Sequence, residues 1–271
     1  MPEGDTIHKI ANFLAPRLIG RTLLRVSMAD ATAAQRCTGR RVQNIMARGK
    51  HLFIELDNST ALRSHLGMYG SWHFYAPDEP WRKPSSQASL VVTTSDEIYV
   101  CFNAKEVELV EQPSVRERML KAHLGPDLIS DDVAPNAIVR RAREFLDGDL
   151  LLADALLDQR IACGIGNVYK SEVLFIEGWS PLTRLDDLAD AEIAQCYLTA
   201  ASLLKCNLGG GRRFTRFEGD GLSGLWVYGR GGRPCLRCNG RIEIAHLGRH
   251  RRSTYWCGTC QNRTRVNKPP S

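Results

Sequence analysis

The chain has 271 residues, which is enough for about two domains of ordinary size. Hydrophobic residues make up 43% and charged residues 24%, so we expect a packed globular fold and exclude wholesale disorder. No apolar run approaches the roughly 20 residues that span a bilayer, and the start MPEGDTIHKI lacks the apolar core of a secretory signal. We therefore expect a cytoplasmic protein without a membrane partner.

The formal net charge of +6 is distributed unevenly along the chain. Residues 1–204 carry a net charge of −5, whereas residues 205–271 carry 14 Lys and Arg against 3 Asp and Glu, a net +11. A cationic segment of this kind predicts a polyanionic partner, and nucleic acid is the first expectation. A membrane surface is the alternative, but no basic amphipathic helix is obvious there.

The sequence predicts a first part rich in β-strands and a second part that is mainly helical. Apolar periodicity predicts a helix over residues 4–15, with Asp5 as its N-cap and Pro16 limiting its extent. Short segments rich in β-branched and aromatic residues then predict an antiparallel β-sandwich over roughly the first 110 residues. The expected strands are 22–26, 51–56, 61–66, 71–75, 89–93 and 98–102. From about residue 115 the helical period takes over, with expected helices at 138–145, 150–159, 167–176 and 190–205.

Four of the nine cysteines form a metal-binding pattern. Cys235, Cys238, Cys257 and Cys260 have the spacing C-x2-C-x18-C-x2-C, which predicts a tetrahedral site with four thiolate ligands. We expect one structural zinc ion there, because four thiolates leave no coordination position open for water. The other five cysteines are interpreted as small apolar residues, since a disulfide framework is not expected in a reducing compartment.

Pro2 is a candidate nucleophile. Removal of the initiator Met would make it an N-terminal secondary amine, and α-amino groups titrate at about pH 8 in model peptides. A secondary amine that condenses with a carbonyl becomes a cationic iminium, which promotes β-elimination, and the neighbouring Glu3 can act as general acid and base. The alternative is an ordinary chain terminus that places a proline near the start of a helix.

Two later segments suit phosphate binding. The glycine-rich stretch 163–166 precedes a helix expected to start at Asn167, and helix N-termini favour anions. Arg249, Arg251 and Arg252 precede Cys257, so a metal-stabilised hairpin would hold their guanidinium groups rigidly. The alternatives are an ordinary corner between helices with glycine caps and a solvated basic loop.

Together and in this order, these elements resemble the formamidopyrimidine-DNA glycosylase/endonuclease VIII family of base-excision repair enzymes. The resemblance covers nearly the whole chain. The matching strings are MPEG at 1–4, RGKHLFIEL at 48–56, HLGMYGSW at 65–72, LGPDLIS at 124–130, GIGNVYKSEVLF at 164–175, VYGRGGRPC at 227–235 and the four-cysteine finger.

The resemblance implies an α+β protein with several domains. The implied divisions are an N-terminal helix with a catalytic β-sandwich at 1–114, a linker at 115–129, a helix–two-turns–helix DNA-binding domain at 130–230 and a zinc finger at 231–265. It also implies a bifunctional DNA glycosylase and AP lyase that acts on damaged double-stranded DNA, and we expect a monomer. Pro2 would attack C1′ of the damaged nucleoside with Glu3 as acid and base, and β- and δ-eliminations would follow.

Five further residues match DNA-binding positions of the family. Lys50 matches the lysine of the β-sandwich that contacts a phosphate near the lesion, and we expect it to be a catalytic as well as a DNA-binding residue. Asn167 and Arg252 match the residues that clamp phosphates. Met68 and Tyr69 match the wedge that fills the gap left by a flipped nucleotide, where an apolar plug offsets the cost of unstacking.

Departures from the family pattern bear on the substrate. The stretch 102–107 has no arginine and no aromatic residue at its core, where guanine-lesion enzymes carry an arginine that reads the opposite cytosine. The segment 209–227 is shorter than their lesion-capping loop, and the start MPEGDT resembles actinobacterial-type members of the endonuclease VIII branch. Thr6 stands where many members have a glutamate. We therefore expect a preference for oxidised pyrimidines; the alternatives are a guanine-lesion glycosylase and a non-catalytic zinc-finger DNA-binding protein.

Overall fold

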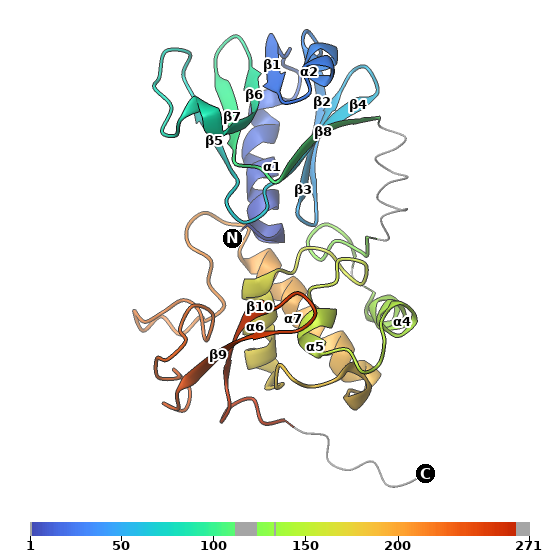
Figure 1. Cartoon of the computed structure of the whole chain (residues 1–271), viewed down its shortest axis with the longest axis vertical. Coiled ribbons are helices and arrows are strands. Elements are labelled where there is room, and N and C mark those ends of the chain that lie inside the picture. Colours follow the sequence, from blue (N-terminus) through green and yellow to red (C-terminus); the bar gives the residue numbers. More distant parts are fainter. Residues whose placement is uncertain (1, 112–123, 133, 264–271) are drawn as a thin grey trace. The chain divides into compact units, whose positions relative to one another are not determined.

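The computed structural model describes residues 2–111, 124–132 and 134–263, and the chain divides into two compact units, residues 1–122 and 123–271 (Figure 1). The first unit is rich in antiparallel strands and the second is mainly helical, which confirms the predicted fold class. The finer four-part division stays a prediction, and residues 115–123 of its linker lie outside the described residues. Among the described helices, none has the length and apolar character that a membrane crossing requires.

Two four-stranded antiparallel sheets build the first unit, with strand orders β1-β6-β7-β5 and β2-β3-β4-β8. Their bounds are β1 (Arg25–Met28), β2 (Val42–Arg48), β3 (His51–Leu56), β4 (Thr60–His65), β5 (Ser71–Tyr75), β6 (Ala88–Thr93), β7 (Ile98–Phe102) and β8 (Glu106–Glu111). The expected strands 51–56, 71–75 and 98–102 are correct at both ends. The sequence analysis missed β2 and β8, and it also missed the short helix α2 (Ala31–Cys37), which Asp30 caps by accepting from the N–H of Ala33 at 3.0 Å.

The core of this unit lies under helix α1 (Gly4–Leu18), which packs against β2 and β3. Leu14 and Leu18 are one helical turn apart and both are buried, so burial of Leu18 outweighs the cost of carrying the helix past Pro16. The expected end at residue 15 was therefore too early. The expected N-cap was also wrong, because Glu3 occupies the cap position and Asp5 lies in the first turn.

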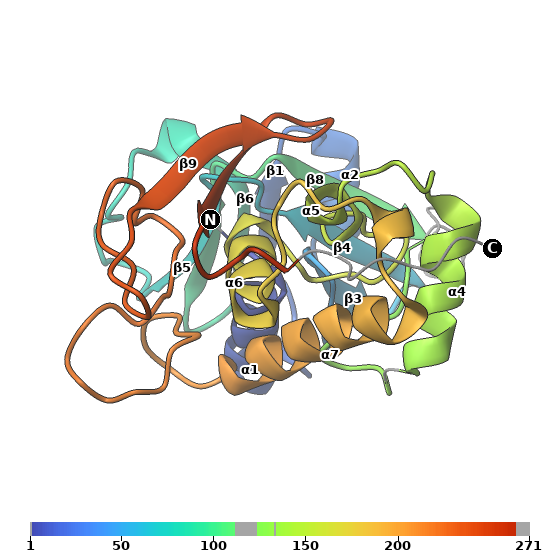
Figure 2. The ribbon, with the colours of Figure 1, turned by 90° about the horizontal axis from the view of Figure 1, so that it is seen from below.

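The second unit contains four α-helices and one hairpin among its described residues: α4 (Pro135–Phe145), α5 (Leu152–Ala155), α6 (Asn167–Glu177), α7 (Asp190–Cys206), β9 (Ile242–Leu247) and β10 (Arg252–Cys257). Helix α7 packs against both α4 and α6 around one apolar core (Figure 2). The side chains of α6 from Asn167 to Phe175 are all buried, as expected for a helix enclosed on every side. It ends at Gly178, whose φ of +76° suits glycine.

Helix α5 is much shorter than the expected helix at 150–159. The Asp158 carboxylate accepts from the backbone N–H of Arg160 at 2.9 Å, and the N–H of Ile161 bonds to the Asp158 carbonyl at 3.1 Å. An aspartate that bonds to its own backbone in this way competes with helix formation. The chain therefore leaves the helix and turns toward the glycine-rich segment.

Candidate functional site

The first site residues lie at the start of α1. Glu3 is the N-cap residue, and its carbonyl accepts from the N–H groups of Thr6 and Ile7 at 3.0 and 3.2 Å. Its side chain is fully buried, whereas Pro2 is partly exposed one residue earlier. The structure therefore places Pro2 one residue before the N-cap, at the positive end of a helix dipole, and adjacent in sequence to a buried carboxyl group. Met1 lies outside the described residues.

Lys50 lies at the tip of the β2–β3 hairpin. Arg48 and His51 pair across the hairpin and leave only Gly49 and Lys50 as the loop. Gly49 has a φ of +56°, the left-handed conformation that such tight turns favour in glycine. A two-residue loop has little freedom, so the partly exposed Lys50 is presented from a rigid base.

Two histidines lie side by side behind this hairpin tip. His51 of β3 and His65 of β4 pair across the sheet with ring centroids 4.8 Å apart. Burial, followed by the neighbouring His65 and Arg63, lowers the pKa of His51 to about 3. Arg63 Nη1 lies 2.8 Å from His51 Nδ1, and a guanidinium can only donate, so Nδ1 accepts. Arg63 also bonds to Glu106 and Glu108 of β8, at 2.8 and 2.7 Å. This ionic network, which the sequence analysis missed, fixes a neutral imidazole next to Lys50.

Met68 and Tyr69 lie in the tight turn that joins β4 to β5. The N–H of Gly70 bonds to the Leu66 carbonyl at 3.0 Å, and a Cβ on Gly70 would lie 2.4 Å from that oxygen. Gly67 has a φ of +64° at the other side of the turn. The turn is therefore closed tightly, and it leaves the side chains of Met68 and Tyr69 52% and 77% exposed, as a wedge requires.

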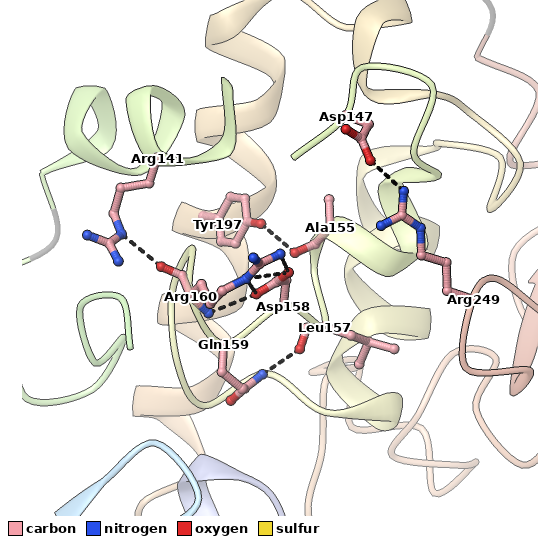
Figure 3. A network of polar contacts seen from close by, with 9 residues as sticks. All are labelled: Arg141, Asp147, Ala155, Leu157, Asp158, Gln159, Arg160, Tyr197 and Arg249. Carbon is pink, nitrogen blue, oxygen red and sulfur yellow. Dashed lines mark hydrogen bonds and ion pairs between the residues drawn. The ribbon is translucent and has the colours of Figure 1, made fainter. Parts of the chain in front are cut away.

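Side chains hold the turn that leads into the glycine-rich segment before α6, and Figure 3 shows two of the bonds, from Gln159 to Leu157 and from Arg141 to Arg160. The Gln159 amide donates to the carbonyls of Leu157 and Ile165, at 2.7 and 3.1 Å, and accepts from the N–H of Gly164 at 3.1 Å. Arg141 of α4 donates to the Arg160 carbonyl at 2.8 Å. These hydrogen bonds fix the turn that precedes α6. The sequence analysis did not identify Gln159 as a residue that holds this turn.

Asn167 and Arg252, predicted from two distant motifs, lie on two elements that pack together, α6 and β10. Asn167 is the first residue of α6, and its Nδ2 lies 2.7 Å from the Ser253 carbonyl and 3.1 Å from the Ser253 hydroxyl. Arg252 directly precedes Ser253 at the start of β10 and is exposed. The N-terminus of α6 thus lies against the strand that carries Arg252, and helix N-termini and arginines are both groups that can bind a phosphate.

Arg249 takes a different position from Arg252, although the sequence analysis grouped the two. Its guanidinium pairs with Asp147 at 2.7 Å (Figure 3), and its backbone N–H bonds to Asp154 at 3.0 Å. A Cβ on the preceding Gly248 would lie 2.2 Å from the Asp154 carboxylate. Arg249 therefore docks the tip of the β9–β10 hairpin onto the segment around α5.

The four cysteines of the pattern come together at the base of the hairpin. The Sγ atoms of Cys235, Cys238, Cys257 and Cys260 all lie within 4.8 Å of one another. Sulfur–zinc bonds of about 2.3 Å in a tetrahedron place the sulfurs a little under 4 Å apart, so the cluster fits a zinc finger. The N–H groups of Arg237 and Gly240 point at Cys235 and Cys238, both at 3.4 Å, as expected for thiolate ligands.

A buried carboxylate links two of the sequence segments that resemble the family, residues 164–175 and 227–235. Glu172 of α6 is fully buried and accepts from the N–H groups of Trp226, Val227 and Tyr228 at 2.8 to 2.9 Å, and from the Thr215 hydroxyl. Burial raises the pKa of Glu172, and the four hydrogen bonds oppose that rise. The sequence analysis did not single out Glu172; the available signal was one acidic residue inside the apolar run of α6.

Comparison with known proteins agrees with this architecture in both units. Residues 1–134 match the family model of the formamidopyrimidine-DNA glycosylase N-terminal domain, and residues 124–218 match that of its H2TH domain. The chain is 37% identical over 265 residues to a probable endonuclease 8 2 of Streptomyces coelicolor, covering 96% of this chain and 94% of the relative. It is 36% identical over 265 residues to the DNA-(apurinic or apyrimidinic site) lyase Nei2 of Mycolicibacterium smegmatis, covering 96% and 99%.

Solved structures with the same fold include the formamidopyrimidine-DNA glycosylase of Lactococcus lactis bound non-covalently to DNA containing an AP site. That chain superposes with a TM-score of 0.82 at 23% identity and covers 97% of this chain and 100% of its own. The fold, the two family-model matches and the four-cysteine cluster together define a DNA glycosylase. The chain belongs to the formamidopyrimidine-DNA glycosylase/endonuclease VIII family of DNA glycosylases and AP lyases.

Proposed function

We propose that this chain excises oxidised bases, with pyrimidines preferred, from double-stranded DNA through an iminium formed on Pro2. The observation that carries the proposal is the geometry at the start of α1, where Pro2 directly precedes the helix and the Glu3 carboxyl is fully buried. A helix N-terminus disfavours a protonated amine, so the Pro2 nitrogen is kept nucleophilic near neutral pH once Met1 has been removed.

The chemistry then follows from the secondary amine. The Pro2 nitrogen attacks C1′ as the glycosidic bond breaks, and the departing base takes the proton that the amine loses. Glu3, as general acid, then gives a second proton to the ring oxygen, so that opening of the sugar ring leaves a cationic iminium on the Pro2 nitrogen. Loss of a C2′ proton expels the 3′ phosphate, a second elimination expels the 5′ phosphate, and water releases the enzyme from the sugar fragment.

DNA-backbone contacts are assigned to both units. Lys50 at the β2–β3 hairpin tip, and Asn167 with Arg252 at the start of α6 and β10, bind phosphates of the damaged strand. Met68 and Tyr69 fill the space of the flipped nucleotide, which recovers part of the unstacking cost. The four cysteines hold one zinc ion with a structural role, and the enzyme acts as a monomer in the cytoplasm.

The preference for pyrimidines is supported by the turn between β7 and β8. Asn103 bonds to Gln87 at 3.0 Å, and the N–H of Ala104 bonds to Ser89 at 3.0 Å. Lys105, the cationic side chain of this turn, pairs with Glu106 at 3.2 Å. This connection between the two sheets is thus held by Gln87 and Ser89, and it contributes no arginine that could read an opposite cytosine.

Borohydride trapping tests the proposal. Mature protein, shown by mass spectrometry to lack Met1, is incubated with a duplex containing thymine glycol and with one containing 8-oxoguanine opposite cytosine. We expect a covalent adduct between Pro2 and DNA with both duplexes, and faster trapping with the duplex that contains thymine glycol. Protein that retains Met1 and still incises damaged duplexes would overturn the iminium mechanism, and faster trapping on 8-oxoguanine would favour the guanine-lesion alternative.

A non-catalytic DNA-binding protein is the rival from another class. It would use the cationic finger but would not need a free Pro2 amine. Fusion of a tag to the amino terminus separates the two functions, because it blocks the amine and leaves the finger intact. A tagged protein that binds duplex DNA normally and forms no adduct supports the enzyme; trapping by untagged protein is the matching positive control.

A further inference from the structure

Lys170 is a buried cation to which the proposed chemistry assigns no role. It lies one turn into α6, and 1% of its surface is exposed. Its Nζ lies 2.6 Å from Asn167 Oδ1, 2.7 Å from Thr254 Oγ1 and 3.3 Å from the Ser253 carbonyl. A buried ammonium group is costly unless its donors are satisfied, and these three oxygens can accept all three of its N–H bonds.

The first consequence concerns the orientation of the Asn167 amide. The oxygen and nitrogen ends of an asparagine side chain are nearly equal in shape, so its neighbours decide which way it points. Because Lys170 can only donate, it holds Oδ1 on its own side. The Nδ2 end must then face β10, where it lies 2.7 Å from the Ser253 carbonyl.

The second consequence concerns the strand that carries Arg252. The Thr254 hydroxyl accepts from Lys170 and donates in turn to the Arg252 carbonyl at 3.1 Å. Lys170 also donates to the carbonyl of Ser253, the residue between the two. One ammonium group thus bonds to three consecutive residues of β10, directly or through one hydroxyl, and to the first residue of α6.

We propose that Lys170 is a positioning residue for DNA-backbone binding, which fixes Asn167 and the strand bearing Arg252 in one arrangement for a shared phosphate site. It acts behind the surface and does not touch DNA. The proposal rests on the proposed function, because it assigns a support to residues proposed to bind the damaged strand.

A double-mutant cycle tests this role. Affinity is measured for a duplex that contains a tetrahydrofuran abasic-site analogue, with wild type, K170M, N167A and the double variant. We expect K170M to weaken binding about tenfold, the size of a hydrogen bond to a charged group. If Lys170 acts through Asn167, K170M adds little to the loss in the N167A background. Multiplicative losses, or a K170M variant that binds as tightly as wild type, would overturn the proposal.

Two controls keep the result specific. R140M removes a cation that is exposed on α4 of the same unit, outside the cationic segment, and we expect its affinity to match wild type. The loss in K170M should appear in KM and not in the single-turnover rate at saturating DNA, whereas partial unfolding would lower the active fraction. If K170M does not fold, T254V and T254S carry the test: T254S keeps the hydroxyl and should bind like wild type, and T254V should not.

The outcome is distinguishable from failure of the proposed function. Wild-type protein that forms no borohydride adduct would contradict the glycosylase-lyase mechanism, whatever Lys170 does. Wild-type protein that forms the adduct, together with equal affinities of K170M and wild type, would contradict only the positioning role.

Discussion

The carboxylate of Glu172 lies 2.9 Å from the backbone nitrogen of Val227, although the two residues are 55 positions apart in the chain. Both carboxylate oxygens accept, because Trp226 donates to one and Tyr228 to the other, each at 2.8 Å. Glu172 thereby holds residues 226–228 against α6, and this segment leads into the first pair of cysteines. The Arg237 guanidinium covers the same junction, 4.4 Å above the Phe175 ring.

Substitution of Glu172 by Gln should therefore destabilise the second unit. A glutamine keeps the shape but turns one acceptor into an NH₂ group that faces backbone N–H donors. We expect the free energy of unfolding to fall by about 2–4 kcal/mol, the cost of disrupting a buried charged hydrogen-bond network. Urea denaturation measures it, with Glu144→Gln on the exposed face of α4 as the matched control. Equal midpoints for the two variants would show that Glu172 is dispensable for stability.

Local patterns in the sequence predict much of the fold. The strand at 51–56 and the helix from Asn167 are short-range features, in which β-branched residues or apolar periodicity are enough. The missed strand β8 also has a local signal, since Glu106 and Glu108 alternate with Val107 and Leu109. The four cysteines are predictable because metal geometry limits their spacing to a narrow range.

The supports of the site could not be predicted in the same way. Glu172 with Val227, and Lys170 with Thr254, are contacts between residues far apart in the chain, and neither partner carries a motif of its own. Arg249 illustrates the same limit. It is the same residue type as Arg252 and lies three positions before it in the sequence. Its pairing with Asp147 arises only in the folded chain.

The low pKa of His51 predicts a pH dependence of stability in the first unit. The folded protein keeps His51 neutral down to pH about 3, whereas the unfolded chain protonates it below its ordinary value of 6.5. The unfolded state thus binds more protons in this window, and stability falls as the pH is lowered from 6.5. Between pH 6.5 and pH 4.5 we expect a loss of about 2 kcal/mol from this residue alone.

Comparison with His51→Gln isolates this contribution. The glutamine variant starts from a lower stability, because Arg63 loses its imidazole partner, but it should lose less on acidification between pH 6.5 and 4.5. His246→Gln, at an exposed position in β9, is the control and should follow wild type. Parallel pH profiles for wild type and His51→Gln would contradict the assignment.

Loss of the metal should detach the β9–β10 hairpin from its base. Thiolates that lose their ion repel one another, and a segment this small has little apolar core of its own. We expect Cys257→Ser to carry less than one zinc per chain and to be cut by trypsin beyond residue 230, with at least tenfold weaker duplex binding. Cys206→Ser, an exposed cysteine outside the cluster, should retain its zinc and its affinity. Full affinity in metal-free protein would show that the hairpin does not depend on the ion.

The two arginines of the hairpin should differ in the salt dependence of DNA binding. Each phosphate contact from a cationic side chain releases about one counterion, so Arg252→Ala should reduce the slope of log K against log[salt] by about one. Arg249 is already paired with Asp147, and exposed pairs of this kind contribute about 0.2–1 kcal/mol to stability. Arg249→Ala should therefore leave the slope unchanged and alter affinity only slightly. An equal decrease of the slope in both variants would mean that Arg249 leaves Asp147 on binding and contacts a phosphate itself.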